Sequence, residues 1–356
     1  MNRIDEVNAK HETLRQIMAA RDADSILLRR PRNIAWFTGG SDPSIDVSNE
    51  AGSYGILVLP EGRLVVANNI EEPRLHAEEA FEALGFEFHS TPWYAEEPPT
   101  TPRMATDEGD IEADIQKQRW VLMEPEQERL RALGRDAAAA IEEAARAVQP
   151  GDTEFEIASR LDAACRRRGG VALVTLIGTD ERISQFRHPF ATGKRLERYA
   201  MLVTCMRRHG LVVSATRLVH IGPAPDELHA ALQRIASIDA AVMLATQPGR
   251  TLGDAFDDLI AAYTAHREAG QWTLHHQGGL AGYAARERIA VPGDPTIIQV
   301  GQAFAWNPSI VGCKSEDTML LVPGGFEIVT EASEMFPTVE VAVGTRVIRR
   351  PGILEL

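Results

Sequence analysis

The stretches Gln149-Pro150-Gly151-Asp152-Thr153 and Gln247-Pro248-Gly249-Arg250-Thr251 are two copies of one short pattern. Each copy separates two segments with helical periodicity, and apolar segments typical of strands follow each pair. The helical segments lie at 124–148 and 154–167 around the first copy, and at 226–245 and 252–268 around the second. A five-residue turn is common by itself, but the repeated order of elements predicts an internal duplication. Two similar halves would then face each other across a cleft floored by a sheet from both.

The chain before the first copy predicts a smaller α/β unit. Helices are expected over 5–20 and 71–84, and strands over 25–28, 34–37, 54–59, 63–67 and 86–88. The proline-rich stretch from Thr91 to Pro102 marks the end of this unit. We therefore expect two domains, at 1–122 and 123–356.

Composition narrows the class of protein. Hydrophobic residues make up 44% and charged residues 25%, which is ordinary for a globular protein, and no apolar run approaches the length of a membrane span. The first ten residues lack the layout of a secretory signal, so we expect a cytoplasmic protein. A net charge of -14 repels phosphate backbones and anionic membranes, so we expect no nucleic acid and no membrane as partners. Cys165, Cys205 and Cys313 have no CxxC spacing, and we expect them to be reduced and structural.

Two dense runs of polar groups among strand-forming residues predict a functional site. The first is Leu274-His275-His276-Gln277-Gly278-Gly279-Leu280-Ala281-Gly282-Tyr283-Ala284-Ala285-Arg286-Glu287. The second joins Phe304-Ala305-Trp306-Asn307-Pro308 to Gly312-Cys313-Lys314-Ser315-Glu316-Asp317-Thr318. A buried sheet tolerates such groups only if something bonds to them.

With these motifs the chain resembles the pita-bread proteins, which include methionine aminopeptidase, prolidase, aminopeptidase P and creatinase. Residues 210–217 followed by Ile221-Gly222 look like the family's GYxSDxTR…IG strand pair. Asn307-Pro308 followed by Glu316-Asp317-Thr318 looks like its EP…EDT ending. The resemblance covers about residues 33–330. It implies an α/β (α+β) fold, with a small N-terminal α/β domain and a C-terminal pita-bread domain that contains a pseudo-twofold duplication.

The resemblance also places the family's five metal ligands on this chain. Peptidases of the family hold two divalent cations with two aspartates, one histidine and two glutamates. The matching positions are Val203, Ser214, Gly279, Asn307 and Glu316. One carboxylate cannot offset the cost of dehydrating two cations, so we expect no dinuclear centre, and the sequence predicts no metal and no cofactor.

Creatinase-like members work without metal, and the histidine that serves them as acid and base corresponds to His188. We therefore predict a metal-independent hydrolase that cleaves a C–N bond in a small non-peptide amide, urea or amidine. His188 would be the general acid and base, and His275 with Glu316 would position water or polarise the substrate. The expected substrate-binding residues are Thr216, Arg217, His276, Tyr283, Arg286, Glu287, Asn307 and Lys314. A small-molecule substrate that is neutral or anionic suits these residues better than a guanidinium compound.

Two alternatives stay open. One is a metallopeptidase of the Xaa-Pro aminopeptidase or prolidase type, with a metal site rebuilt from His188, His275, His276, Glu316 and Asp317. The other is a catalytically inactive pita-bread protein that binds a ligand or partner. The resemblance also implies a homodimer, in which the polar loop 41–53 of one subunit completes the site of its neighbour.

Overall fold

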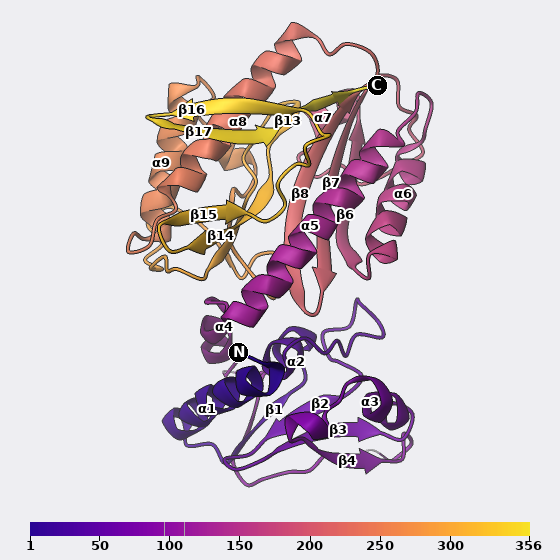
Figure 1. The fold of residues 1–356 in the computed structure, drawn as a ribbon, viewed down its shortest axis with the longest axis vertical. Helices are drawn as coiled ribbons and strands as arrows, with labels where there is room; N and C mark the ends of the chain where they lie inside the picture. The colour runs from indigo at the N-terminus through magenta and orange to yellow at the C-terminus, as the bar shows by residue number, and fades with distance from the viewer. Residues whose placement is uncertain (96, 110) are drawn as a thin grey trace. The chain divides into compact units, whose positions relative to one another are not determined.

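The computed structural model describes residues 1–95, 97–109 and 111–356, and it divides the chain into two compact units (Figure 1). The N-terminal unit is Met1–Arg129 with His209–Leu211, and the C-terminal unit is Leu130–Arg208 with Val212–Leu356. The division falls inside helix α5 (Glu124–Arg146). Glu96, in the proline-rich stretch that the sequence singles out, lies outside the described residues.

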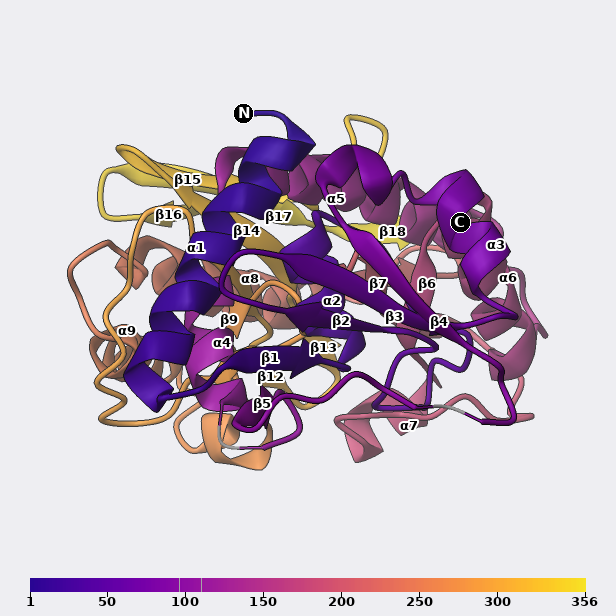
Figure 2. The same cartoon turned by 90° about the horizontal axis from the view of Figure 1, so that it is seen from below.

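The N-terminal unit is built on a mixed sheet in the order β4-β3-β2-β1-β5, and Figure 2 shows its first four strands side by side. The strands are β1 (Ser25–Leu28), β2 (Gly55–Val58), β3 (Arg63–Asn68), β4 (Glu87–Thr91) and β5 (Met104–Thr106). The helices are α1 (Arg3–Arg21), α2 (Pro31–Thr38), α3 (Glu72–Glu78), the 3-10 helix η1 (Glu82–Leu84) and α4 (Glu112–Arg119). In β3 buried residues alternate with half-buried ones, as expected for a strand with one face on the core.

Two sequence predictions fail in this unit. The predicted strand over 34–37 is helix α2, which starts with Pro31 in its first turn and ends at Gly39, whose φ is 73°. Every residue from Asn33 to Thr38 is buried, so the helix has almost no polar face and its sequence gives no helical period. The predicted helix over 71–84 is interrupted at Ala80, whose φ is 54°, and continues as η1.

The C-terminal unit contains the duplicated architecture. Its first half consists of α5, α6 (Glu154–Arg167), β6 (Val171–Thr179), α7 (Glu181–Gln185), β7 (Tyr199–Arg208) and β8 (Leu211–His220). Its second half begins with α8 (Asp226–Ala245), α9 (Leu252–Ala265), η2 (Gln271–Leu274), β9 (Gly278–Ala281), β10 (Arg288–Ile289) and β11 (Ala303–Trp306). It continues with β12 (Ser309–Ile310), β13 (Cys313–Lys314), β14 (Asp317–Val322), β15 (Gly325–Ile328), β16 (Thr338–Val343), β17 (Arg346–Pro351) and β18 (Ile353–Glu355). The sheets run β18-β8-β7-β6 and β10-β9-β11-β14-β15, and Figure 1 shows α5 and α6 along the first of them.

The internal duplication is confirmed by matching geometry at the two turns. Thr153 and Thr251 both cap a helix, and each forms a reciprocal capping box with the acidic residue three positions on. Backbone bonds repeat as well, since the N–H of Gly151 donates to Leu196 O and that of Gly249 donates to Ile298 O, both at 2.9 Å. These turns therefore hold equivalent places in the two halves.

Helix α8 is an exception to the expectation that no apolar segment is long enough to span a membrane. It is long and apolar enough to cross a membrane by length and hydropathy alone. Half of the tested stretch is buried, and the helix packs against α9 and β16. This burial is typical of a core helix.

The two larger sheets of the C-terminal unit meet where β8 lies against the start of β14. The backbone N–H of Thr216 donates to Glu316 O at 3.0 Å, and the N–H of Ser214 donates to Thr318 Oγ1 at 2.7 Å. This junction brings the polar ends of both halves together.

Candidate active site

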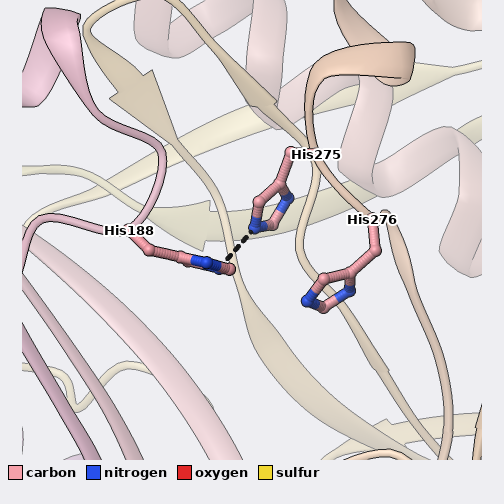
Figure 3. A group of neighbouring side chains, drawn as sticks. All are labelled: His188, His275 and His276. Atoms are coloured by element: carbon pink, nitrogen blue, oxygen red, sulfur yellow. Dashed lines mark hydrogen bonds between the residues drawn. The ribbon is translucent and has the colours of Figure 1, made fainter.

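Three histidines from two separate segments converge in the C-terminal unit (Figure 3). His188 follows α7, and His275 and His276 connect η2 to β9. The Nε2 atoms of His188 and His275 are 2.8 Å apart, so one ring donates a hydrogen bond to the other. The rings of His275 and His276 stack with centroids 4.6 Å apart and an interplanar angle of 22°. One ring nitrogen from each residue lies within 4.8 Å of the other two.

Neighbouring side chains fix both segments. The guanidinium of Arg187 donates to Ser309 Oγ at 3.3 Å and to the side-chain oxygen of Gln271. The hydroxyl of Tyr263 donates to Gln277 Oε1 at 2.7 Å, and Gln277 Nε2 donates to backbone carbonyls just before it. Sequence reasoning missed Arg187 and Gln277 as positioning residues. The one sequence feature that could have indicated them is that Arg187 precedes His188 and Gln277 follows His276.

Burial and nearby cations keep these imidazoles neutral. Burial, reinforced by the positive charge of Lys314, lowers the pKa of His275 to about 2. Burial and the charge of Arg286 lower the pKa of His276 to about 4. His188 is exposed as a whole residue, but partial desolvation of its ring and the charge of Lys314 still lower its pKa. The Nδ1 atoms of His275 and His276 have no hydrogen-bond partner within the described part of the chain.

Glu316 lies between two cations beside the histidines. Its Oε2 accepts from Lys314 Nζ and from Thr216 Oγ1, both at 2.7 Å, and its Oε1 accepts from Arg286 Nη2 at 3.0 Å. Burial raises the carboxyl pKa, but Lys314 and Arg286 outweigh burial and lower the pKa to about 2. The carboxylate is therefore charged at pH 7. Two cations against one anion leave this group with one excess positive charge.

The structure places Arg217, which we expected to bind substrate, in a buried network instead. Its side chain is fully buried and donates to Asp317 Oδ1 at 3.0 Å and to Thr330 O at 2.7 Å. Asp317 also pairs with Arg350 at 2.9 Å. Both residues are therefore structural, and Asp317 is not free to help rebuild a metal site.

The remaining predicted residues are buried around the site. Tyr283 is 3% exposed, and its backbone N–H donates to Glu287 Oε1 at 3.1 Å, which closes the loop between β9 and β10. Asn307 is 2% exposed, and its backbone N–H donates to Gln277 O. Its Oδ1 lacks a hydrogen-bond partner among the residues that the structure describes. Tyr283 and Glu287 thus support the loop, and Asn307 alone of the three carries an unsatisfied polar atom.

Comparison with known proteins places the chain in a family. A family model described as metallopeptidase family M24 matches residues 128–323, which is more than half of the chain. The chain belongs to metallopeptidase family M24. A second model, described as the Creatinase/Prolidase N-terminal domain, matches residues 10–117. The search of curated proteins gave no match.

Solved structures share the fold at low sequence identity. The prolidase from Pyrococcus horikoshii OT3 has a TM-score of 0.74 and 17% identity, with 92% of this chain and 99% of that chain covered. The Xaa-Pro dipeptidase from Bacillus anthracis has a TM-score of 0.73 and 16% identity, with coverage of 98% and 100%. The N-terminal domain of the FACT complex subunit SPT16 from Cicer arietinum (chickpea) has a TM-score of 0.66 and 11% identity, with coverage of 93% and 96%. The predicted pita-bread fold is confirmed.

The prediction of a metal-independent enzyme for a non-peptide amide, urea or amidine is wrong. The matched family is one of metallopeptidases, and similar structures carry the names prolidase and Xaa-Pro dipeptidase. These findings support the peptidase alternative, and membership of M24 makes the chain a member of a hydrolase family.

The residues present do not fit the two-cation centre that the family implies. Val203 offers no ligand atom, Ser214 and Asn307 are neutral, and both oxygens of Glu316 are occupied by cations. Gly279 has a φ of +144°, and a Cβ there would lie 2.3 Å from the backbone oxygen of Arg288. No side chain fits at that position without a backbone shift. The residues at the positions that the resemblance assigns therefore do not fit a centre of that kind.

Proposed function

We propose that this chain hydrolyses a peptide-type C–N bond in a short peptide. One observation carries the proposal. His188 and His275 are hydrogen-bonded to each other close to Glu316 and its two cations, Lys314 and Arg286, and all of these residues lie inside the segment that matches the metallopeptidase family. Hydrolysis of an amide needs a group that moves protons and a group that orients the substrate. Here the two histidines would move protons, and Lys314 and Arg286 would orient the substrate.

The charge of the site supports a substrate that carries a carboxylate. Among the residues that the structure describes, Arg286 and Lys314 form ion pairs with Glu316 alone, so this half-buried to buried group carries one excess positive charge. A carboxylate bound here would gain charge-assisted hydrogen bonds. The free C-terminus of a dipeptide meets this need.

His188 is the residue best placed to move a proton. Its ring is exposed, whereas His275 is buried and holds His188 through the Nε2 to Nε2 hydrogen bond. Because its pKa lies below the ordinary value of histidine, His188 is neutral at pH 7 and accepts a proton from an attacking water. The same ring returns that proton to the leaving nitrogen, so the proton count balances.

The test is release of amino acids from a panel of dipeptides by the purified chain, with and without added divalent ions. We expect turnover of dipeptides with a free C-terminus and a kcat/KM lower by about 10- to 100-fold for their C-terminal amides, because the amide loses a charge-assisted hydrogen bond. His188→Ala should lower kcat by roughly 10²- to 10⁴-fold. His266→Ala, at the end of α9, is the matched control and should keep full activity. Absence of hydrolysis under every condition would refute the proposal.

A binding protein without catalysis is the second candidate. The blocked position at Gly279 and the occupied carboxylate of Glu316 favour it, because both remove groups that the family's centre would need. Titration calorimetry with the same dipeptides separates the two candidates. Binding without release of product would support this candidate over hydrolysis.

A further inference from the structure

We propose that His188, His275 and His276 form a site for one divalent transition-metal ion, zinc by its ligand chemistry. This inference rests on the proposed function in one respect, because it names the ion that the same site would take. A His188 ring that binds the ion cannot also take the proton of the attacking water, so in the metal-bound form a hydroxide at the open fourth position would replace His188 as the source of the nucleophile. It replaces a centre of two cations held by carboxylates with a centre of one cation held by imidazoles.

The geometry of the three rings is close to what one ion needs. Zinc binds imidazole nitrogen at about 2.0–2.1 Å, so tetrahedral ligand atoms lie about 3.3 Å apart. The Nε2 atoms of His188 and His275 are 2.8 Å apart, and all three ligand atoms lie within 4.8 Å of one another. Small rotations of the rings would bring the three nitrogens around one ion. His188 lies in an exposed loop, so its ring has room to make this adjustment.

The kind of ligand selects the kind of ion. Mg²⁺ and Ca²⁺ prefer oxygen ligands. The nearby carboxylate of Glu316 could offer oxygen, but both of its oxygens already pair with Lys314 and Arg286, so the site does not suit these ions. Imidazole nitrogens suit zinc and its neighbours in the first transition row. Three protein nitrogens would leave the fourth position of a tetrahedral ion open for water or substrate.

The buried position of His275 supports a ligand at this place. Its side chain is only 9% exposed, and its Nδ1 has no partner in the described ranges. An unsatisfied buried nitrogen is costly, and a structure keeps it when another group compensates. A bound ion that takes this nitrogen as its ligand would satisfy the lone pair directly.

The neighbouring charges determine what accompanies the ion. Lys314 and Arg286 together exceed Glu316 by one positive charge, which opposes a dication. An anionic fourth ligand, either hydroxide or the carboxylate of a substrate, would offset this repulsion. Removing the charge at position 314 should therefore strengthen metal binding.

The experiment measures metal binding directly. The chain is stripped of metal with a chelator, and zinc binding is then measured by competition with a chromophoric chelator. Co²⁺ is then added as a spectroscopic probe, because tetrahedral Co²⁺ absorbs strongly in visible light. We expect one equivalent of zinc per chain and a tetrahedral Co²⁺ spectrum that zinc abolishes.

Variants locate the ion. His188→Ala and His276→Ala should each weaken zinc binding by at least about 100-fold, because loss of a direct ligand costs at least as much as loss of a group that only supports one. His266→Ala is the control and should bind zinc like the parent. Lys314→Met should tighten binding on the order of tenfold, since it removes a cation near the ion. Circular dichroism checks that each variant is folded.

The proposed metal site and the proposed hydrolysis can be refuted independently of each other. The metal site would be overturned if the stripped chain binds no zinc. It would also be overturned if zinc binds to the two histidine variants as tightly as to the parent. If the stripped chain cleaves dipeptides at full rate and zinc does not bind to it, the metal site is refuted while the proposed function stands. If zinc binds as expected and no dipeptide is cleaved, the metal site stands and the proposed function falls.

Discussion

At the scale of single residues, Glu316 sets the charge of the site. It is 2% exposed and holds Lys314 and Arg286 through its two oxygens. Because burial alone would favour the neutral acid, its ionised state depends on both cations. The position that would serve the family as a metal ligand thus serves here to hold two basic side chains.

Glu316→Gln should lower the free energy of unfolding by about 3–5 kcal/mol, because the substitution leaves two poorly compensated cations in the protein interior. Urea denaturation at pH 7 measures the change. Glu334→Gln, at an exposed position, is the control and should change stability by less than about 0.5 kcal/mol. Equal midpoints for both variants would contradict the inferred role of Glu316.

The pH dependence of stability should report the same carboxylate. Its folded pKa of about 2 lies below the ordinary value of 4.5, so the ionised form stabilises the fold above pH 4.5. That contribution, about 3 kcal/mol, should be lost as the pH falls from about 4.5 to about 2. We expect denaturation midpoints of the parent to fall more steeply over this window than those of Glu316→Gln. Parallel curves would be inconsistent with a depressed pKa.

Part of the site was predictable from residues alone. His188, His275, Glu316, Arg286 and Lys314 do come together, because family motifs place them on neighbouring strands and loops. Arg217 was misassigned because its partners lie about a hundred positions away. No local pattern indicates that Asp317 and the carbonyl of Thr330 would satisfy its guanidinium.

At the scale of elements, β9 carries the feature that most restricts the site. Gly279 pairs with Ile289 of β10 on one side and with Ala305 of β11 on the other, and its φ of +144° suits glycine alone. The strand therefore passes close to both neighbours with no room for a side chain.

Gly279→Ala should destabilise the protein by about 2–4 kcal/mol, since the new Cβ would lie 2.3 Å from Arg288 O and the backbone would be strained. Thermal unfolding measures the effect. Gly193→Ala is the matched control, because a Cβ at Gly193 meets no atom within 4 Å. A Gly279→Ala variant as stable as the control would show that β9 can move.

The two helix caps should behave alike. Thr153→Ala and Thr251→Ala each remove a side chain that accepts a hydrogen bond from the backbone three residues on, so each should cost about 1 kcal/mol. Thr264→Ala, within exposed residues of α9, serves as the control. Chemical denaturation of the three variants gives the comparison. A cost at only one cap would argue against equivalent roles for the two turns.

Sequence pattern predicted the long helices well and α2 badly. Helices α6 and α8 match their predicted ranges, because apolar spacing and flanking turns agree there. Helix α2 is buried from Asn33 to Thr38, and an element buried on all sides loses the period that identifies it.

At the scale of the whole molecule, both units carry exposed apolar side chains, and those of the N-terminal unit include Ile45, Val47, Ile70, Trp93 and Tyr94. Ile45 and Ile70 line one pocket, and the rings of Trp93 and Tyr94 pack edge to face. Neighbouring exposed apolar groups are typical of surfaces that bind another protein. We propose a second copy of this chain as the partner.

Sedimentation equilibrium should therefore give twice the mass of one chain at micromolar concentration. Trp93→Glu combined with Tyr94→Glu should shift the equilibrium toward single chains, because charges would be buried at the contact. Met335→Glu, which changes a side chain that is 79% exposed in the C-terminal unit, is the control. A parent chain that sediments as a single copy would exclude the dimer.

The crowding around Gly279 also limits how a metal centre could be engineered into this chain. A carboxylate at Ser214 or Asn307 would be a change of side chain, whereas a histidine at position 279 would also require β9 and β10 to move apart. A designer who wants a two-cation centre here will therefore have to rebuild a strand as well as its side chains.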